Sequence, residues 1–216
     1  MNLLKNRLKK LVMAALVVCA ALPAADAAYM LCKAELAQHL IKRAWADPDQ
    51  QARPWPWADT HPVARLNVDR LGLQTWVLSG ATGNVLAFGP GLATGSSQPG
   101  HRGVTLIGGH RDTHFKPLQH IKNGDVIDLQ GLDRQWHRYR VTSIDIADSR
   151  TESIISDTPE ATLLLVTCYP FNALTSGGPL RYVVEAELLA TKIDKNPTTD
   201  AAQQAVAGNF EAYNGL

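Results

Sequence analysis

The amino-acid sequence predicts an all-β domain of the barrel or sandwich type. From Val63 onward, short β-prone runs alternate with turn signals rich in glycine, proline and asparagine. Eight such runs fall within about 125 residues, and this spacing of short strands is typical of barrels and sandwiches. The whole chain has 216 residues, of which 45% are hydrophobic and 19% charged, as in an ordinary globular protein.

The predicted strands share a length of four to ten residues and are bounded by turn-forming residues such as Thr82-Gly-Asn84, Gly89-Pro-Gly91 and Asn123-Gly-Asp125. A short helical turn is expected between Ser149 and Pro159. The eight predicted strands are Val63–Val68, Leu73–Leu78, Val85–Phe88, Val104–Gly108, Val126–Gln130, His137–Ile146, Thr162–Thr167 and Leu180–Leu188.

Residues 1–31 have the pattern of a targeting segment. Four basic side chains precede an apolar stretch, Leu11–Ala25, that ends at Asp26. Such a stretch is shorter than the roughly 20 residues of a typical spanning helix and suits a signal peptide. An uncleaved signal anchor is the alternative, because Ala27–Leu31 extends the apolar length. Both interpretations place the rest of the chain outside the cytoplasm.

Residues 32–62 are predicted to form a helix and a connector. Apolar residues between Lys33 and Asp47 recur at helical spacing, and Asp47-Pro48 ends the pattern. The connector contains Trp55 and Trp57, each directly after a proline. We interpret these tryptophans as a clamp that covers the domain, and a substrate-facing aromatic platform is the alternative.

The balance of charged residues argues against a nucleic-acid partner. Beyond the first ten residues acidic side chains outnumber basic ones, so the chain lacks the basic patch expected for nucleic-acid binding. Residues 191–216 are polar and alanine-rich, and we expect a loosely attached tail there.

Cys168 is the first candidate for chemistry. The apolar run Thr162–Thr167 delivers it to the end of a strand, where Pro170 stops the hydrogen-bonded ladder. In an exported protein structural cysteines pair, and Cys168 has only Cys32 as an available partner beyond the apolar segment that holds Cys19. A rigidly held, unpaired thiol suits a nucleophile, whereas a buried core cysteine is the alternative.

His110 follows another strand and two glycines. An imidazole beside a thiol can stabilise the thiolate and later protonate a leaving amine. A surface or capping histidine is the alternative. His110, Asp112 and His114 also invite a metal interpretation, but a zinc pair at this spacing normally sits on a helix with a glutamate between the ligands. We therefore predict no metal and no cofactor.

Arg181 opens the strand that follows the Ser176-Gly-Gly-Pro179 turn, thirteen residues after Cys168. So short a connection favours an antiparallel neighbour, which places Arg181 close to the cysteine. A fixed cation there can stabilise an oxyanion. The alternative is a surface arginine paired with Glu185 or Glu187, and Arg111 and Arg140 are weaker candidates for the same role.

In these segments the sequence resembles the sortases, and especially a branch described as marine proteobacterial. The resemblance covers about residues 31–189. The matching segments are Leu163-Leu-Leu-Val-Thr-Cys168-Tyr-Pro-Phe171, Gly109-His-Arg-Asp-Thr-His-Phe115, Gly177-Gly-Pro-Leu-Arg-Tyr-Val-Val184, Pro54-Trp-Pro-Trp-Ala-Asp59 and Ala87-Phe-Gly-Pro-Gly91.

The resemblance implies a closed eight-stranded barrel over residues 63–190 that cleaves a C-terminal sorting signal, commonly an L-P-x-T-G-like pentapeptide. It implies Cys168 as the nucleophile, His110 as the proton donor and acceptor, and Arg181 as the oxyanion or peptide ligand, with Thr167 beside the thiol.

His114 and Asp112 belong to the motif without an assigned step. The expected partner is an exported protein with that signal. The acceptor amine stays open, and the N-terminal segment is expected to hold the protein at the periplasmic side of the inner membrane.

Two other functions stay open on the residues alone. One is a different exported cysteine peptidase or transpeptidase. In papain-like enzymes the cysteine precedes the histidine, whereas here His110 precedes Cys168. L,D-transpeptidases have a Ser-x-Gly-Cys run, which the Thr167-Cys-Tyr-Pro170 segment does not match. The other is a non-catalytic exported domain that binds peptides or glycans through its tryptophans.

Overall fold

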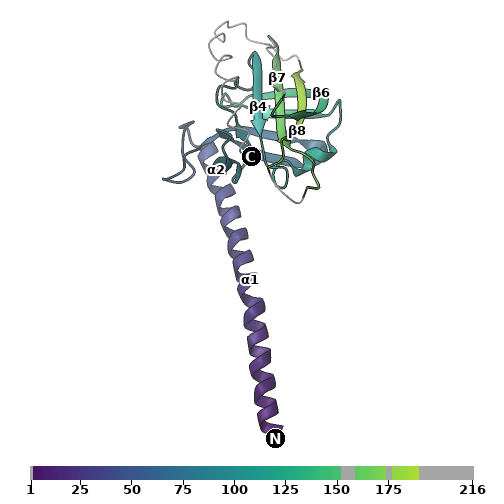
Figure 1. Cartoon of the computed structure of the whole chain (residues 1–216). Helices are drawn as coiled ribbons and strands as arrows, with labels where there is room; N and C mark the ends of the chain where they lie inside the picture. Colours follow the sequence, from purple (N-terminus) through teal and green to yellow (C-terminus); the bar gives the residue numbers. More distant parts are fainter. Residues whose placement is uncertain (1, 152–158, 174–176, 190–216) are drawn as a thin grey trace. The chain divides into compact units, whose positions relative to one another are not determined.

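The computed structural model of the chain describes residues 2–151, 159–173 and 177–189. Eight strands close into a barrel in the order β1-β2-β3-β4-β7-β8-β6-β5, which confirms the predicted all-β closed barrel (Figure 1). The strands are β1 (Pro62–Val68), β2 (Leu73–Ser79), β3 (Gly91–Leu92), β4 (Gly103–Gly108), β5 (Val126–Gln130), β6 (Trp136–Asp148), β7 (Ala161–Cys168) and β8 (Leu180–Leu188). The helices are α1 (Asn2–Ala46) and α2 (Gly83–Leu86), with 3-10 turns η1 (Asp69–Leu71) and η2 (Lys116–His120).

Seven predicted strands are present within a few residues of the expected bounds, but the prediction of a strand at Val85–Phe88 is wrong. That segment contains helix α2, whose Val85 is buried against Ile41 and Leu78. A four-residue apolar run has no periodicity that separates a strand from a buried helical turn. The eighth strand, β3, begins instead at Gly91, where a Cβ would lie 2.0 Å from the carbonyl oxygen of Gly80.

The order of pairing gathers four strand termini at one end of the barrel. β4 runs parallel to β7, while β8 is antiparallel to both β7 and β6. The carboxyl ends of β4, β7 and β6 therefore lie at the same end as the start of β8. Figure 1 shows these strands side by side.

β7 is buried on both of its faces. Leu163 and Leu165 belong to the main hydrophobic cluster, whereas Leu164 and Val166 belong to a second cluster. This explains the continuous apolar run in the sequence, because a strand covered on both sides needs no polar alternation. Cys168 is the first residue of β7 that is only partly buried.

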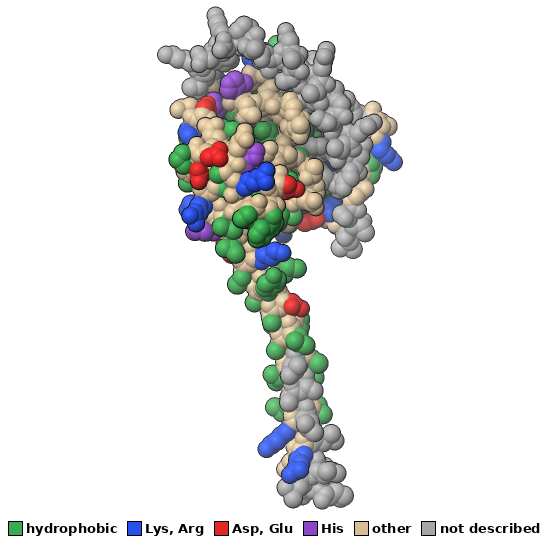
Figure 2. Space-filling model, turned by 90° about the vertical axis from the view of Figure 1, so that its left-hand side faces the viewer, with side chains coloured by type: hydrophobic (Ala, Val, Ile, Leu, Met, Phe, Trp, Pro, Cys, Tyr) green, Lys and Arg blue, Asp and Glu red, His purple; other side chains and the backbone are tan. Residues whose placement is uncertain are grey.

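The N-terminal unit, residues 1–40, is helical from Asn2 onward, and α1 ends at Ala46. The sequence predicted a separate helix from Lys33, but no helix-breaking residue stands between the apolar segment and Lys33, and the helix passes through Pro23. Exposed hydrophobic side chains line this helix (Figure 2), among them Val12, Leu16 and Leu22. In the part of the chain that the structure describes, none of the helices combines the length and the apolar character that a membrane span needs.

The two connector tryptophans have different surroundings. Trp55 packs edge-on against Phe88 with ring centroids 4.9 Å apart, whereas Trp57 is 82% exposed. The predicted clamp is therefore correct for Trp55 and wrong for Trp57. The last turn of α1 supplies the other cover: Trp45 is buried, and Arg134 lies over its ring and donates a hydrogen bond to its carbonyl oxygen.

Two predicted features lie wholly or largely outside the described residues. They are the tail at residues 191–216 and most of the helical turn between Ser149 and Pro159.

Candidate active site

Cys168 lies at the end of β7, directly opposite Arg181 on β8. Its thiol is free and partly exposed, and neither Cys19 nor Cys32 forms a disulfide. Hydrogen bonds fix the residues on both sides of Cys168, Thr167 and Tyr169. The Thr167 hydroxyl donates to the carbonyl oxygen of Gly109 at 2.7 Å, and the Tyr169 amide donates to the carbonyl oxygen of Leu180 at 3.0 Å. The cysteine is therefore accessible on a rigid backbone, which is the arrangement a nucleophile needs.

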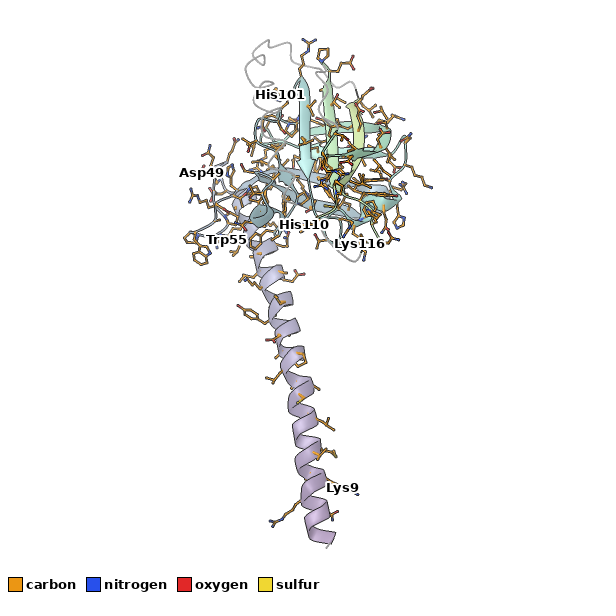
Figure 3. The ribbon with its side chains drawn as sticks, viewed as in Figure 1. Lys9, Asp49, Trp55, His101, His110 and Lys116 are labelled. Carbon is orange, nitrogen blue, oxygen red and sulfur yellow. The ribbon has the colours of Figure 1, made fainter. Side chains whose placement is uncertain are left out.

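His110 leaves the end of β4, the strand beside β7. The parallel register pairs Gly108 with Val166, and the Gly109 amide extends the ladder to the Val166 carbonyl oxygen. His110 and Cys168 each lie two residues beyond that pair, so the two adjacent strands end with the imidazole and the thiol. Figure 3 labels His110 at this end of the barrel.

Close packing after β4 accounts for the glycine at position 109. A Cβ on Gly109 would lie 2.7 Å from the ring of Phe115, a residue that is completely buried. The Phe115 amide in turn donates to the carbonyl oxygen of His110 at 3.1 Å. The phenylalanine thus packs beneath the backbone that carries His110, and this close packing explains the glycine before the histidine.

His114 lies near His110 and is partly buried. Burial lowers the pKa of His114, and the positive charge of His110 lowers it further. Asp112 is exposed, and the guanidinium of Arg111 lowers the pKa of its carboxyl group. Across the described residues, no three His, Cys, Asp or Glu side chains are placed to hold a metal ion.

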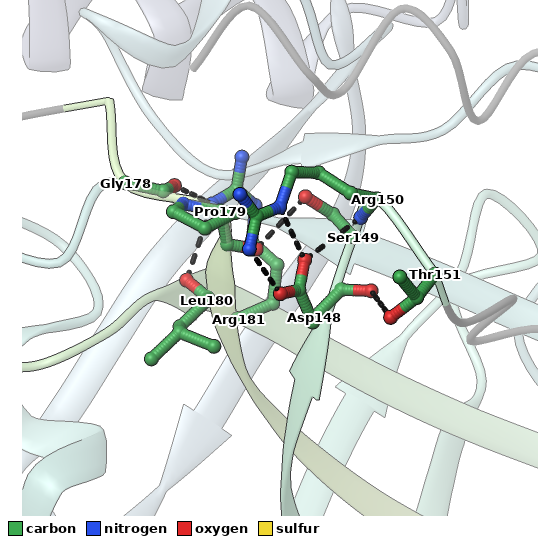
Figure 4. Close-up of polar contacts among 8 residues, drawn as sticks. All are labelled: Asp148, Ser149, Arg150, Thr151, Gly178, Pro179, Leu180 and Arg181. Atoms are coloured by element: carbon green, nitrogen blue, oxygen red, sulfur yellow. Dashed lines mark hydrogen bonds and ion pairs between the residues drawn. The ribbon is translucent and has the colours of Figure 1, made fainter.

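Arg181 is buried, with 2% of its surface exposed, so it is not the surface arginine of the alternative interpretation. Its Nη1 donates to the carbonyl oxygens of Gly178 at 2.6 Å and Leu180 at 3.1 Å (Figure 4). These bonds hold the guanidinium over the turn that begins β8. The pKa of Asp148 is lowered to about 2, chiefly because Arg150 donates hydrogen bonds to that carboxylate. The positive charge of Arg181 lowers the same pKa further.

Arg111 is also buried, which the sequence did not predict. On the sequence alone Arg111 is a weaker candidate for the cation than Arg181, because its position next to His110 does not reveal its contacts with residues far along the chain. In the structure its guanidinium donates to the carbonyl oxygens of Pro170 at 2.7 Å and Ala173 at 3.2 Å. Arg140, the other weaker candidate, is exposed on β6 opposite Glu187 and Val126, away from Cys168.

An aromatic cluster supports the same end of the barrel. Tyr169 stacks on Tyr182, and Phe171 meets Tyr182 edge-on with centroids 5.1 Å apart. Phe171 and Tyr182 also pack against the main hydrophobic cluster. The cluster therefore anchors the chain immediately after Cys168.

Known proteins resemble this chain in sequence and in fold. The Sortase domain family matches residues 66–189. Sortase D from Bacillus subtilis (strain 168) is 29% identical over 120 residues, which cover 55% of this chain and 60% of that relative, so the match spans less than two thirds of its length.

Two solved structures are similar in fold. A Clostridium perfringens Sortase D5 transpeptidase matches with a TM-score of 0.53 and 26% identity, over 60% of this chain and 80% of its own. Sortase A from Corynebacterium diphtheriae matches with a TM-score of 0.55 and 22% identity, over 68% of this chain and 69% of its own. With the family match extending over more than half of its residues, this chain belongs to the sortase family.

Proposed function

We propose that this protein is a cysteine transpeptidase that cleaves a C-terminal sorting signal and transfers the new acyl end to an amine. One observation carries the proposal most directly: the partly exposed thiol of Cys168 lies opposite the buried guanidinium of Arg181, on the strand next to the one that delivers His110. Thiol, imidazole and fixed cation are the three groups that acyl transfer through a thioester requires.

In the proposed reaction, the Cys168 thiolate attacks the carbonyl carbon of the scissile peptide bond. Negative charge develops on the carbonyl oxygen, and Arg181 is the cation available to stabilise it. His110 gives a proton to the departing amine, and the carbon–nitrogen bond breaks to leave a thioester on Cys168. An acceptor amine, deprotonated by the same imidazole, then attacks the thioester; the carbon–sulfur bond breaks and releases the Cys168 thiolate beside a protonated His110. Thr167 keeps its hydroxyl bond to Gly109 throughout and so supports the thiol's position.

The proposed substrate is an exported protein with an L-P-x-T-G-like signal. This rests on the resemblance of the Cys168, His110 and Arg181 segments to the sortases. A Clostridium perfringens sortase C, which shares the fold, has been solved with the C-terminal cell wall sorting motif. The resemblance is to a branch from bacteria that lack the thick cell wall to which sortases classically attach proteins, so the proposal names no particular acceptor amine. We assign no metal or cofactor to the reaction.

We further propose that residues 63–190 are the catalytic domain and that residues 1–31 direct it to the periplasmic side of the inner membrane. The basic N-terminal end and the apolar stretch that follows support this proposal. Edman sequencing of the membrane and soluble fractions of expressing cells separates a cleaved signal from an anchor. A full-length chain recovered in the cytosol contradicts both.

A transpeptidation assay tests the activity. The full-length chain is incubated with a panel of L-P-x-T-G-like peptides and a glycine-based amine, and ligated product is followed by mass spectrometry. We expect His110→Ala and Arg181→Met to lower kcat/KM at least 100-fold, as expected for lost acid–base or oxyanion groups. Arg138→Gln, an exposed control on β6, is expected to keep wild-type activity. Hydrolysed peptide without any ligated product supports a cysteine peptidase instead, and an intact panel contradicts the proposal.

A further inference from the structure

Arg111 is a buried cation whose contacts join two segments at the barrel end. Only 5% of its side chain is exposed. Its guanidinium bonds to the Asp112 carboxylate, with Nε 3.0 Å from Oδ1 and Nη2 3.2 Å from Oδ2. The same group donates to the carbonyl oxygens of Pro170 and Ala173 at 2.7 and 3.2 Å. One planar fork therefore satisfies a carboxylate on its own segment and two carbonyls on the segment after Cys168.

Two sets of hydrogen bonds join the His110 segment to the Cys168 segment, one before and one after the proposed catalytic residues, and Arg111 makes the second set. On one side, Gly109 accepts the hydroxyl bond of Thr167, and these residues immediately precede His110 and Cys168. On the other side, Arg111 follows His110 directly and bonds to Pro170, two residues after Cys168. The histidine and the cysteine are thus each bracketed by residues that bond to the other's segment.

Charge adds to the geometry. The hydrogen bonds that Arg111 donates to Asp112 are the largest cause that raises the pKa of Arg111, and an electrostatic interaction with Cys168 contributes to the same rise. Arg111 therefore interacts electrostatically with both the Asp112 carboxylate and Cys168.

We propose that Arg111 is a positioning residue for the catalytic pair: by holding the Pro170–Ala173 segment against the His110 segment, it fixes how the thiol and the imidazole face each other. The role rests on the proposed transpeptidase activity, in which Cys168 and His110 must act on the same scissile bond. Arginine suits this role better than lysine, because a single ammonium cannot form the planar fork that reaches all three partners.

Three full-length variants test the proposal. Arg111→Met removes the fork and the charge, whereas Arg111→Lys keeps only the charge. The matched control is Arg138→Gln, which removes an arginine that also bonds to a carboxylate, Asp128 at 2.8 Å, but lies exposed on β6. Each protein is compared for kcat and KM in transpeptidation and for amide hydrogen exchange in the peptide containing Tyr169–Ala173.

We expect Arg111→Met to lower kcat roughly 10- to 100-fold with KM changed less than threefold, since small misplacements of reacting groups have effects of that size. Exchange of the Tyr169–Ala173 amides should rise at least tenfold while that of β1 and β2 stays unchanged. Arg111→Lys should recover part of kcat, and Arg138→Gln should match wild type. If Arg111→Met proves unfolded by its melting curve, Arg111→Lys decides, because full kcat in that variant overturns the role of the fork.

Two further outcomes overturn the proposal: faster local exchange with unchanged kcat, and lower kcat with unchanged local exchange. A wild-type protein that ligates no peptide contradicts the transpeptidase activity itself. In that case the rate of Cys168 alkylation by iodoacetamide, followed on its own tryptic peptide, decides about Arg111. A rate at least threefold slower in Arg111→Met supports the proposal, and an equal or faster rate overturns it.

Discussion

At the scale of single residues, Gly109 shows how tightly the backbone that carries His110 is packed. A methyl group there would enter the ring of buried Phe115. We expect Gly109→Ala to lower the free energy of unfolding by about 1–3 kcal/mol, the usual cost of overpacking, as measured by urea denaturation. Gly83→Ala is the matched control, because nothing lies within 4 Å of its added Cβ, and it should change stability by less than about 0.5 kcal/mol. Equal stability of the two variants contradicts this account.

Asp148 provides a residue-scale test of pH dependence. Hydrogen bonds from Arg150 hold its pKa at about 2, below the ordinary value of 3.8. A carboxyl group with a depressed folded-state pKa contributes stability above its unfolded pKa and loses it as the pH falls through the folded value. The contribution is therefore complete above about pH 4 and disappears toward pH 2. Melting temperatures of Asp148→Asn and Arg150→Gln should both fall less than wild type between pH 4 and pH 2. A wild-type slope in both variants contradicts the assignment.

The sequence was sufficient to predict which residue types gather at the candidate site, but not how their side chains are held. Cys168, His110 and Arg181 each stand at a strand boundary marked by glycine or proline, so their positions follow from local patterns. The role of Arg111 depends on carbonyl oxygens at Pro170 and Ala173, and no local pattern reveals contacts with residues 59 and 62 positions further along the chain.

At the scale of elements, the last turn of α1 packs against the barrel through Trp45. Its indole lies 5.5 Å from that of Trp76, and Arg134 lies over its ring at 4.1 Å. We expect Trp45→Ala to cost about 3–5 kcal/mol of unfolding free energy, as for other buried aromatic truncations. Trp57→Ala, at an exposed position of the connector, should cost less than about 0.5 kcal/mol. Chemical denaturation of both variants checks the pair, and comparable losses contradict the distinction between the two tryptophans.

The elements that the sequence predicted well are those with a long, clear pattern. β5 and β8 have the predicted bounds, and β7 differs by one residue at each end. The error at Val85–Phe88 arose because four apolar residues fit a helical turn as well as a strand. β3 has only two residues, Gly91 and Leu92, and it forms because a glycine allows the chain to cross close to Gly80. That closeness is a tertiary contact, which strand propensity does not record.

At the scale of the whole molecule, the order in which the strands pair explains why residues far apart in sequence form one site. The parallel pairing of β4 with β7 joins residues near position 108 to residues near position 166, and the antiparallel pairing of β7 with β8 adds Arg181. The sequence predicted eight strands, and the resemblance implied their closure. The order of the strands around the barrel is what turns three separate motifs into neighbours.

Trapping the acyl intermediate tests the central claim that this arrangement makes Cys168 the nucleophile. The full-length chain is mixed with an L-P-x-T-G-like peptide without an acceptor amine, quenched in acid, digested and examined by mass spectrometry. The account predicts an acyl group on the peptide containing Cys168, removed by hydroxylamine and absent from Cys168→Ala. An acyl group found only at Cys32, or an adduct that persists in Cys168→Ala, would contradict it.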